Sequence, residues 1–148
     1  MTGDPLAGDA GSCGEDGARS CIFAKALLAR AATCTLSQRL PFGERELMEC
    51  ASPVARINCG TLAALLHERA RFALRLPPAS RPLMHVQALR LQCGGLTALA
   101  QQFDAAAPDV HAMVGAALDR HGSLTGLPWD VLVAELAAWQ PRRRRRLP

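Results

Sequence analysis

The chain has 148 residues, 49% of them hydrophobic, which suits a single domain with a sizeable core. Its formal net charge is +4, but Arg142 to Arg146 supply five positive charges, so the rest of the chain carries −1. The basicity belongs to one terminal run and does not indicate a folded nucleic-acid-binding surface. No stretch approaches the roughly 20 apolar residues that a membrane-spanning helix needs.

The N-terminal stretch has neither the basic start nor the apolar run of a signal peptide, so we expect a cytoplasmic protein. Six cysteines in a reducing compartment are not expected to form permanent disulfides. We therefore expect them to be free thiols, metal ligands or redox-active groups.

The composition favours helices, because only six residues are aromatic and the core must consist mainly of Leu, Ala and Val. We predict an all-α protein, a compact bundle of five to six helices. The Gly-rich, acidic residues 1–17 are predicted to be a disordered arm. Residues 18–140 are predicted to form one helical domain, and residues 141–148 an Arg-rich tail.

Helix-boundary residues predict two helices in the first third of the chain. The first begins at Ser20, a good N-cap, and runs to about Arg39. The second runs from Glu44 to about Ala51. Ser52-Pro53 is expected to stop it, since the residue before a proline avoids helical geometry.

Four further helices are predicted in the rest of the chain. The third, with an apolar stripe at helical spacing, begins near Asn58 or Thr61 and ends near Leu76. The fourth spans residues 83–103 and contains Gly94-Gly95. The fifth runs from Pro108 or Asp109 to Gly122, and the sixth from Pro128 to just before Pro141.

The cysteines carry the most suggestive chemistry in the sequence. No two of them are separated by only two residues, as they are in most structural zinc sites. Such wide spacing suits ligands that separate helices and their ends bring to one centre. Their positions are Cys13, Cys21, Cys34, Cys50, Cys59 and Cys93.

Local geometry sorts these cysteines. Cys34 and Cys50 lie eight residues on either side of Phe42, so a chain that folds back there brings them to the same height. On one unbroken helix, Cys21 would lie about 20 Å from Cys34, too far to share a cluster unless that helix is broken. Cys59, expected at a helix start, should have a lowered thiol pKa.

Cys93 precedes two glycines, which would allow a bulky inorganic group or a neighbouring helix to approach the backbone. We therefore predict a cysteine-ligated metal protein with Cys34, Cys50, Cys59 and Cys93 as ligands and Cys21 as the substitute for one of them. All-thiolate ligation without tight pairs favours a [4Fe–4S] iron–sulfur cluster over zinc. Electron transfer, sensing and cluster delivery all fit such a centre.

Several alternatives remain open. The cysteines could be core residues, or a reversible disulfide such as Cys34–Cys50 could act as a redox switch. His67 could complete a mixed site with Cys59. No motif of a hydrolase or nucleotide-binding enzyme is present, so an enzyme is not the favoured class.

A non-metal interaction protein is the main competing hypothesis. Its exposed run of Arg142, Arg143, Arg144, Arg145 and Arg146 would dock on an acidic partner protein. Nucleic acid is a weaker alternative partner. Its phosphates could bind the same arginines, or the predicted helix at residues 44–51 and the one after it could form a helix–turn–helix unit.

Overall fold

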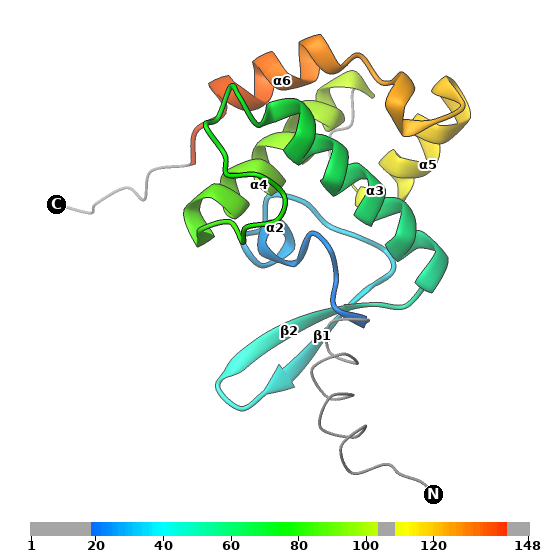
Figure 1. The fold of residues 1–148 in the computed structure, drawn as a ribbon. Coiled ribbons are helices and arrows are strands. Elements are labelled where there is room, and N and C mark those ends of the chain that lie inside the picture. The colour runs from blue at the N-terminus through cyan, green and yellow to red at the C-terminus, as the bar shows by residue number, and fades with distance from the viewer. Residues whose placement is uncertain (1–18, 104–108, 142–148) are drawn as a thin grey trace, which may run out of the picture.

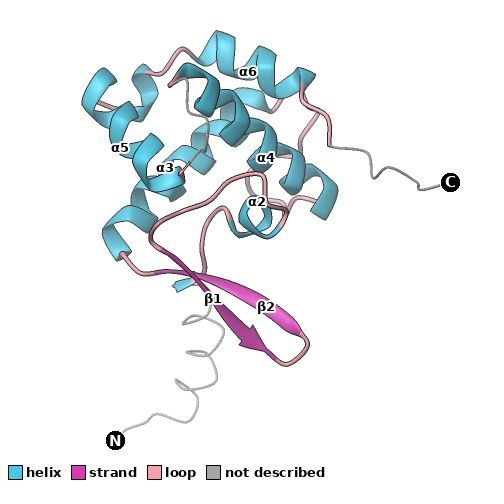
Figure 2. Cartoon of the chain, turned by 180° about the vertical axis from the view of Figure 1, so that it is seen from behind, coloured by secondary structure: helices cyan, strands magenta, loops and turns pink. Residues whose placement is uncertain are grey.

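A computed structural model describes residues 19–103 and 109–141. In this part of the chain the helices pack above a projecting two-stranded hairpin (Figure 1). The hairpin extends away from the helical layer, as the view from behind also shows (Figure 2). The helices are α2 (Ala24–Leu28), α3 (Pro53–Ala70), α4 (His85–Gln102), α5 (Val110–His121) and α6 (Trp129–Ala138), with a 3-10 turn η1 at Leu124–Gly126. The strands are β1 (Ser37–Phe42) and β2 (Arg45–Cys50).

The core lies between α3, α4, α5 and α6. Most of its fully buried large side chains are leucines, among them Leu62, Leu96 and Leu136. Gly95 lies against Leu66 of α3, and a Cβ at Gly94 would lie 3.2 Å from Trp139 Cβ. The glycine pair therefore allows neighbouring helices to approach α4 closely, which is one of the two possibilities that the sequence suggested.

The prediction of an all-α fold is wrong, because residues 37–50 form an antiparallel hairpin where the end of the first helix and the second helix were expected. Phe42 pairs with Arg45, leaving Gly43 and Glu44 as a two-residue turn. Gly43 has φ +63°, and a glycine at the first turn position suits the type II′ geometry that matches strand twist. Within β2 only Met48 is buried, so the alternation that marks a strand is weak.

The first predicted helix also breaks early, since α2 has only five residues. A Schellman motif ends the helix: Ala31 N–H donates to Ala26 O, and Arg30 N–H donates to Leu27 O. Arg30 stands at the left-handed position of this motif with φ +60°. Cys21 and Cys34 are therefore not separated by a continuous helix.

Ser52-Pro53 begins a helix where it was predicted to stop one. The Ser52 hydroxyl accepts a hydrogen bond from Ala55 N–H, and Pro53 occupies the first helical position, where its missing N–H costs nothing. As a result α3 starts five residues earlier than the earlier of the two predicted starts.

No helix within residues 19–103 and 109–141 is long and apolar enough to cross a membrane. The predicted arm at residues 1–17 and the arginines of the predicted tail lie outside the described residues.

Candidate metal centre

Four cysteines from four separate segments line one cavity at the junction of the hairpin and the helices. Cys21 precedes α2, Cys34 lies in the loop before β1, Cys50 ends β2, and Cys59 lies in α3. All four are half-buried. We call this space the thiol cavity; its wall also includes Leu36, Arg56, Val110 and His111.

Backbone pairing holds Cys21 beside the end of the hairpin. Cys21 N–H donates to Met48 O at 2.9 Å, and Ser20 forms an antiparallel bridge with Glu49. The Cys50 thiol donates to Ser52 O at 3.3 Å, just before α3 begins. Two cysteines that are 29 positions apart in the sequence therefore reach the same cavity.

Asp109 fixes the loop that carries Cys34. Its Oδ1 accepts a hydrogen bond from Thr35 N–H at 2.6 Å, while its Oδ2 caps α5 by accepting from Ala112 N–H at 2.8 Å. Val110 N–H also donates to Thr33 O at 2.8 Å. One carboxylate thus ties the Cys34 loop to the start of a helix more than 70 residues away.

The thiols influence one another electrostatically. Burial, and to a smaller extent the nearby Cys21, Cys34 and Cys50, together raise the pKa of Cys59 from its ordinary value of 9.0 to about 12. Burial also raises the pKa of Cys21, against the effect of a hydrogen bond from the Phe23 backbone. The expected lowering of the Cys59 pKa is wrong, because this residue lies inside α3 and not at its start.

Arg56 is a residue of this cavity that the sequence did not single out for it. It lies one turn before Cys59 on the same side of α3. Its Nε donates to Ser20 O at 2.8 Å, and its charge lowers the pKa of Cys21. Nothing in the sequence indicated that His111 also lines this cavity.

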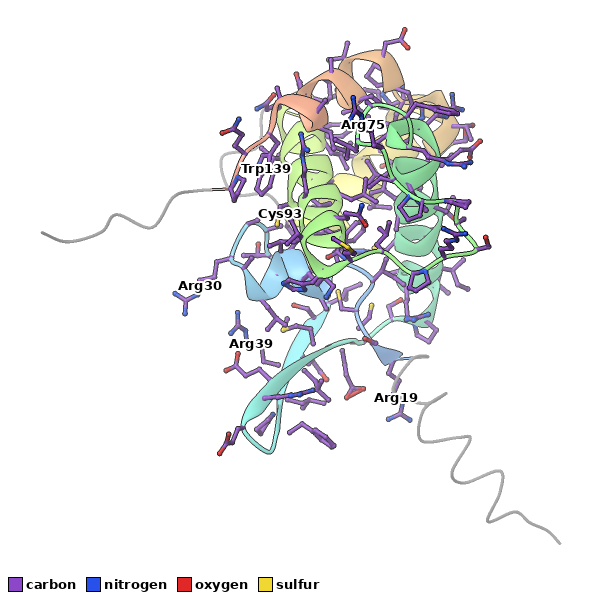
Figure 3. The ribbon with its side chains drawn as sticks, turned by 60° about the vertical axis from the view of Figure 1, so that its left-hand side comes forward. Arg19, Arg30, Arg39, Arg75, Cys93 and Trp139 are labelled. Carbon is purple, nitrogen blue, oxygen red and sulfur yellow. The ribbon has the colours of Figure 1, made fainter. Side chains whose placement is uncertain are left out.

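Cys93 is not part of the thiol cavity. It is 2% exposed, belongs to the hydrophobic core, and lies on α4 near Trp139 (Figure 3). Burial alone raises its pKa. The structure therefore brings together Cys34, Cys50 and Cys59 of the predicted set, with Cys21 in the place of Cys93.

The thiol cavity is small. Its free space is about 10 Å³, the room of one water molecule. Among the described residues, no three His, Cys, Asp or Glu side chains are grouped so that they could hold a metal ion. A zinc ion needs four ligand atoms about 2.0 to 2.3 Å from a single point, and this side-chain arrangement does not provide them.

Two other predicted features are absent from the described part of the chain. His67 does not complete a site with Cys59, because its Nε2 hydrogen-bonds Pro77 O at 2.9 Å away from the thiol cavity. The helix–turn–helix unit is wrong, because β2 occupies the place of its first helix.

No protein-family model matches the chain, and no curated protein or solved structure matches it significantly.

Proposed function

We propose that this chain is a small iron–sulfur protein in which Cys21, Cys34, Cys50 and Cys59 ligate one [4Fe–4S] cluster that transfers electrons. One observation carries the proposal: four of the five described cysteines converge on one cavity from four separate segments. The remaining described cysteine, Cys93, packs in the core as an ordinary small hydrophobic residue.

The electrostatics of the thiol cavity favour a cationic occupant. Each thiol that ionises there makes ionisation of Cys59 harder, so four thiolates are unfavourable while the cavity holds no positive charge. A bound metal centre reverses this balance and keeps its coordinating thiols deprotonated. Cluster binding would then move the thiols apart, and its free energy would also stabilise the folded ligand loops.

A four-iron cluster agrees better with the arrangement than a single zinc ion. A zinc ion draws its four ligands to one point, which the described side chains do not do. A cluster places iron and sulfide between the thiolates, so its binding would have to widen the thiol cavity from about 10 Å³ and spread the four ligands around a larger space.

Electron transfer is favoured among the functions of such a cluster. Four cysteine ligands would occupy the outer position of every iron and leave none open for a substrate. Backbone pairing anchors the segment of Cys21 and Asp109 anchors the Cys34 loop, which suits a resident cluster better than one passed on to another protein. The Arg56 charge near Cys21 would favour the reduced, more negative cluster.

The proposal includes a cytoplasmic location, where cysteines stay reduced. It also includes an acidic protein partner that docks through the arginines at positions 142 to 146, since such a run attracts acidic surfaces.

The test is the iron and acid-labile sulfide content of the full chain purified without air, together with its visible absorption and electron paramagnetic resonance spectra. We expect about four irons and four sulfides per chain, as a [4Fe–4S] centre requires. Zinc without sulfide would contradict the cluster, and a metal-free protein whose thiols pair reversibly under peroxide would indicate a redox switch instead.

Single substitutions identify the ligands. Cys21→Ser, Cys34→Ser, Cys50→Ser and Cys59→Ser should each lose most of the iron, whereas Cys93→Ala, the matched control, should keep it. Loss of iron in Cys93→Ala with full retention in Cys21→Ser would overturn the assignment of Cys21 as the fourth ligand.

A further inference from the structure

A second cavity lies on the other side of Cys34. Its volume is about 390 Å³, within the usual range of small-molecule sites of about 300 to 1,000 Å³. Cys34 and Ser37 line both this space and the thiol cavity, so they form a shared wall between the two. We call the second space the arginine cavity, after Arg30 and Arg39 in its lining.

The lining of the arginine cavity combines apolar and cationic groups. Leu27, Ala32 and Met48 provide buried apolar surface. Arg30 comes from the end of α2 and Arg39 from β1, and both extend on the same side of the molecule (Figure 3). Among the described residues, no acidic side chain lines the cavity itself, and of its two arginines only Arg39 is paired with a carboxylate, that of Glu46.

Arg39 is available to a ligand although it already has a partner. Its Nη1 donates to Glu46 Oε2 at 2.8 Å, and the two side chains are 44% and 58% exposed. Exposed pairs of this kind contribute only about 0 to 1 kcal/mol. A guanidinium has five N–H donors, so Arg39 can bind a second oxyanion while it keeps Glu46.

We propose that the arginine cavity binds a small organic oxyanion, a carboxylate or a phosphate monoester. The charged group would lie between Arg30 and Arg39, and the apolar part would rest on Leu27 and Met48. Guanidinium groups bind carboxylate and phosphate through paired, charge-assisted hydrogen bonds. The recessed apolar surface favours a small molecule over the acidic surface of a protein.

This site would regulate the proposed cluster, and in that respect it rests on the proposed function. An anion beside Cys34 places negative charge next to a ligand of the cluster. Reduction adds a further negative charge to the cluster, so the bound anion should lower the midpoint potential.

Arg75 offers a matched control for Arg30. Both residues are arginines in the left-handed conformation, Arg30 just after α2 with φ +60° and Arg75 at the end of the turn after α3 with φ +53°, but Arg75 lines neither cavity. Glycine adopts this conformation without the steric cost of a Cβ. Arg30→Gly and Arg75→Gly should therefore relieve the backbone equally, while only the first removes a charge from the site.

The experiment is calorimetric titration of the full chain with benzoate, phenyl phosphate and, as a neutral analogue, benzamide, at constant ionic strength. At least one anion should bind saturably and benzamide should not. Arg30→Gly and Arg39→Gln should weaken binding about tenfold or more, the loss of one charge-assisted contact. Arg75→Gly should bind like the unchanged chain.

Absence of saturable anion binding, or equal binding by Arg30→Gly and Arg75→Gly, would overturn the site. Binding of a polyglutamate peptide without binding of either small anion would also overturn it, in favour of an acidic protein partner. The same titration with Cys59→Ser, which cannot hold the full ligand set, separates the two proposals. Arginine-dependent binding to this variant supports the anion site even if no cluster is found.

The regulatory effect is read from the cluster itself. Saturating anion should lower the midpoint potential of the intact protein and leave that of Arg30→Gly unchanged. An unchanged potential in the intact protein despite bound anion would overturn the regulatory role.

Discussion

Helices α3 to α6 bury a continuous core of leucine side chains, whereas the cysteine-bearing end, residues 19–52, is held largely by backbone hydrogen bonds. Phe23, Leu27 and Met48 attach this end to the core, but most of the hairpin is exposed. The hydrophobic effect is the dominant favourable term in folding, so it should stabilise the helical part without help. On the proposed function, binding of the cluster would add stability to the cysteine-bearing end in particular.

Removal of the proposed cluster should give the largest contrast between the two regions. Amides of residues 33–37 and 45–50 should exchange hydrogen about 100-fold faster in metal-free protein, a loss of about 2.7 kcal/mol of local stability. Amides in the middle of α4 should change little. Hydrogen exchange of the loaded and metal-free chain measures both, and an equal loss of protection in α4 would show that the two regions unfold as one unit.

Gly95→Ala should damage the helical part and spare the metal centre. A Cβ there would lie 2.8 and 2.9 Å from the two Cδ atoms of Leu66. Overpacking costs about 1 to 3 kcal/mol, and the better helix propensity of Ala returns about 1 kcal/mol. We expect a net loss of about 1 kcal/mol in denaturant unfolding, with iron content unchanged.

Gly115→Ala is the matched control for that substitution. It lies inside α5 with no side chain or distant backbone atom within 4 Å of the added Cβ. Here only the propensity gain applies, so stability should rise by about 0.5 to 1 kcal/mol. Destabilisation by both substitutions would refute the packing explanation for Gly95.

Asp109→Ala should weaken the connection between the two regions, because it removes the carboxylate that links the Cys34 loop to α5. The loss of an N-cap costs about 0.5 to 2 kcal/mol, and Thr35 N–H loses its acceptor. Iron should be lost to a chelator several times faster than from the unchanged chain. Asp109→Asn preserves a good N-cap, so comparable iron loss in both variants would mean that the cap alone does not explain the effect.

A further prediction concerns the pH dependence of stability in the metal-free protein. The folded state keeps Cys59 protonated up to about pH 12, while the unfolded thiol ionises near pH 9.0. Above pH 9 the unfolded state binds fewer protons, so stability declines as pH rises towards 12 and is fully present below pH 9. Urea unfolding between pH 8 and 11 should show this decline, and Cys59→Ser should reduce it.

The sequence predicts the helical part well and the cysteine-bearing end poorly, for physical reasons. Strong apolar periodicity and boundary residues such as Asp109 and Gly122 located α4, α5 and α6 to within a few residues. The hairpin has one buried position, Met48, and a single diagnostic glycine, Gly43, so its local signal was weak. The Ser52-Pro53 pair is equally good at ending one element and starting the next, and only the fold decides between the two.

The cysteine set shows the same limit. Folding back near Phe42 was correctly expected to bring Cys34 and Cys50 to one place, although strands and not helices do so. Cys93 was grouped with them because local sequence does not distinguish a core thiol from one facing a cavity. The hydrogen bond of Arg56 to Ser20 and that of Asp109 to Thr35 join distant segments of the chain. Sequence periodicity cannot reveal such contacts.

The hydrogen bond between Asp109 and the Cys34 loop affects the order of events while the chain is synthesised and folds. Synthesis proceeds from the N-terminus, so all four cavity thiols leave the ribosome about 50 residues before the carboxylate that secures one of their loops. A nascent chain would therefore present its thiols while their enclosure is still incomplete. Stable insertion of the proposed cluster would then be a late event, and truncated or stalled chains would be left with exposed, oxidisable sulfur.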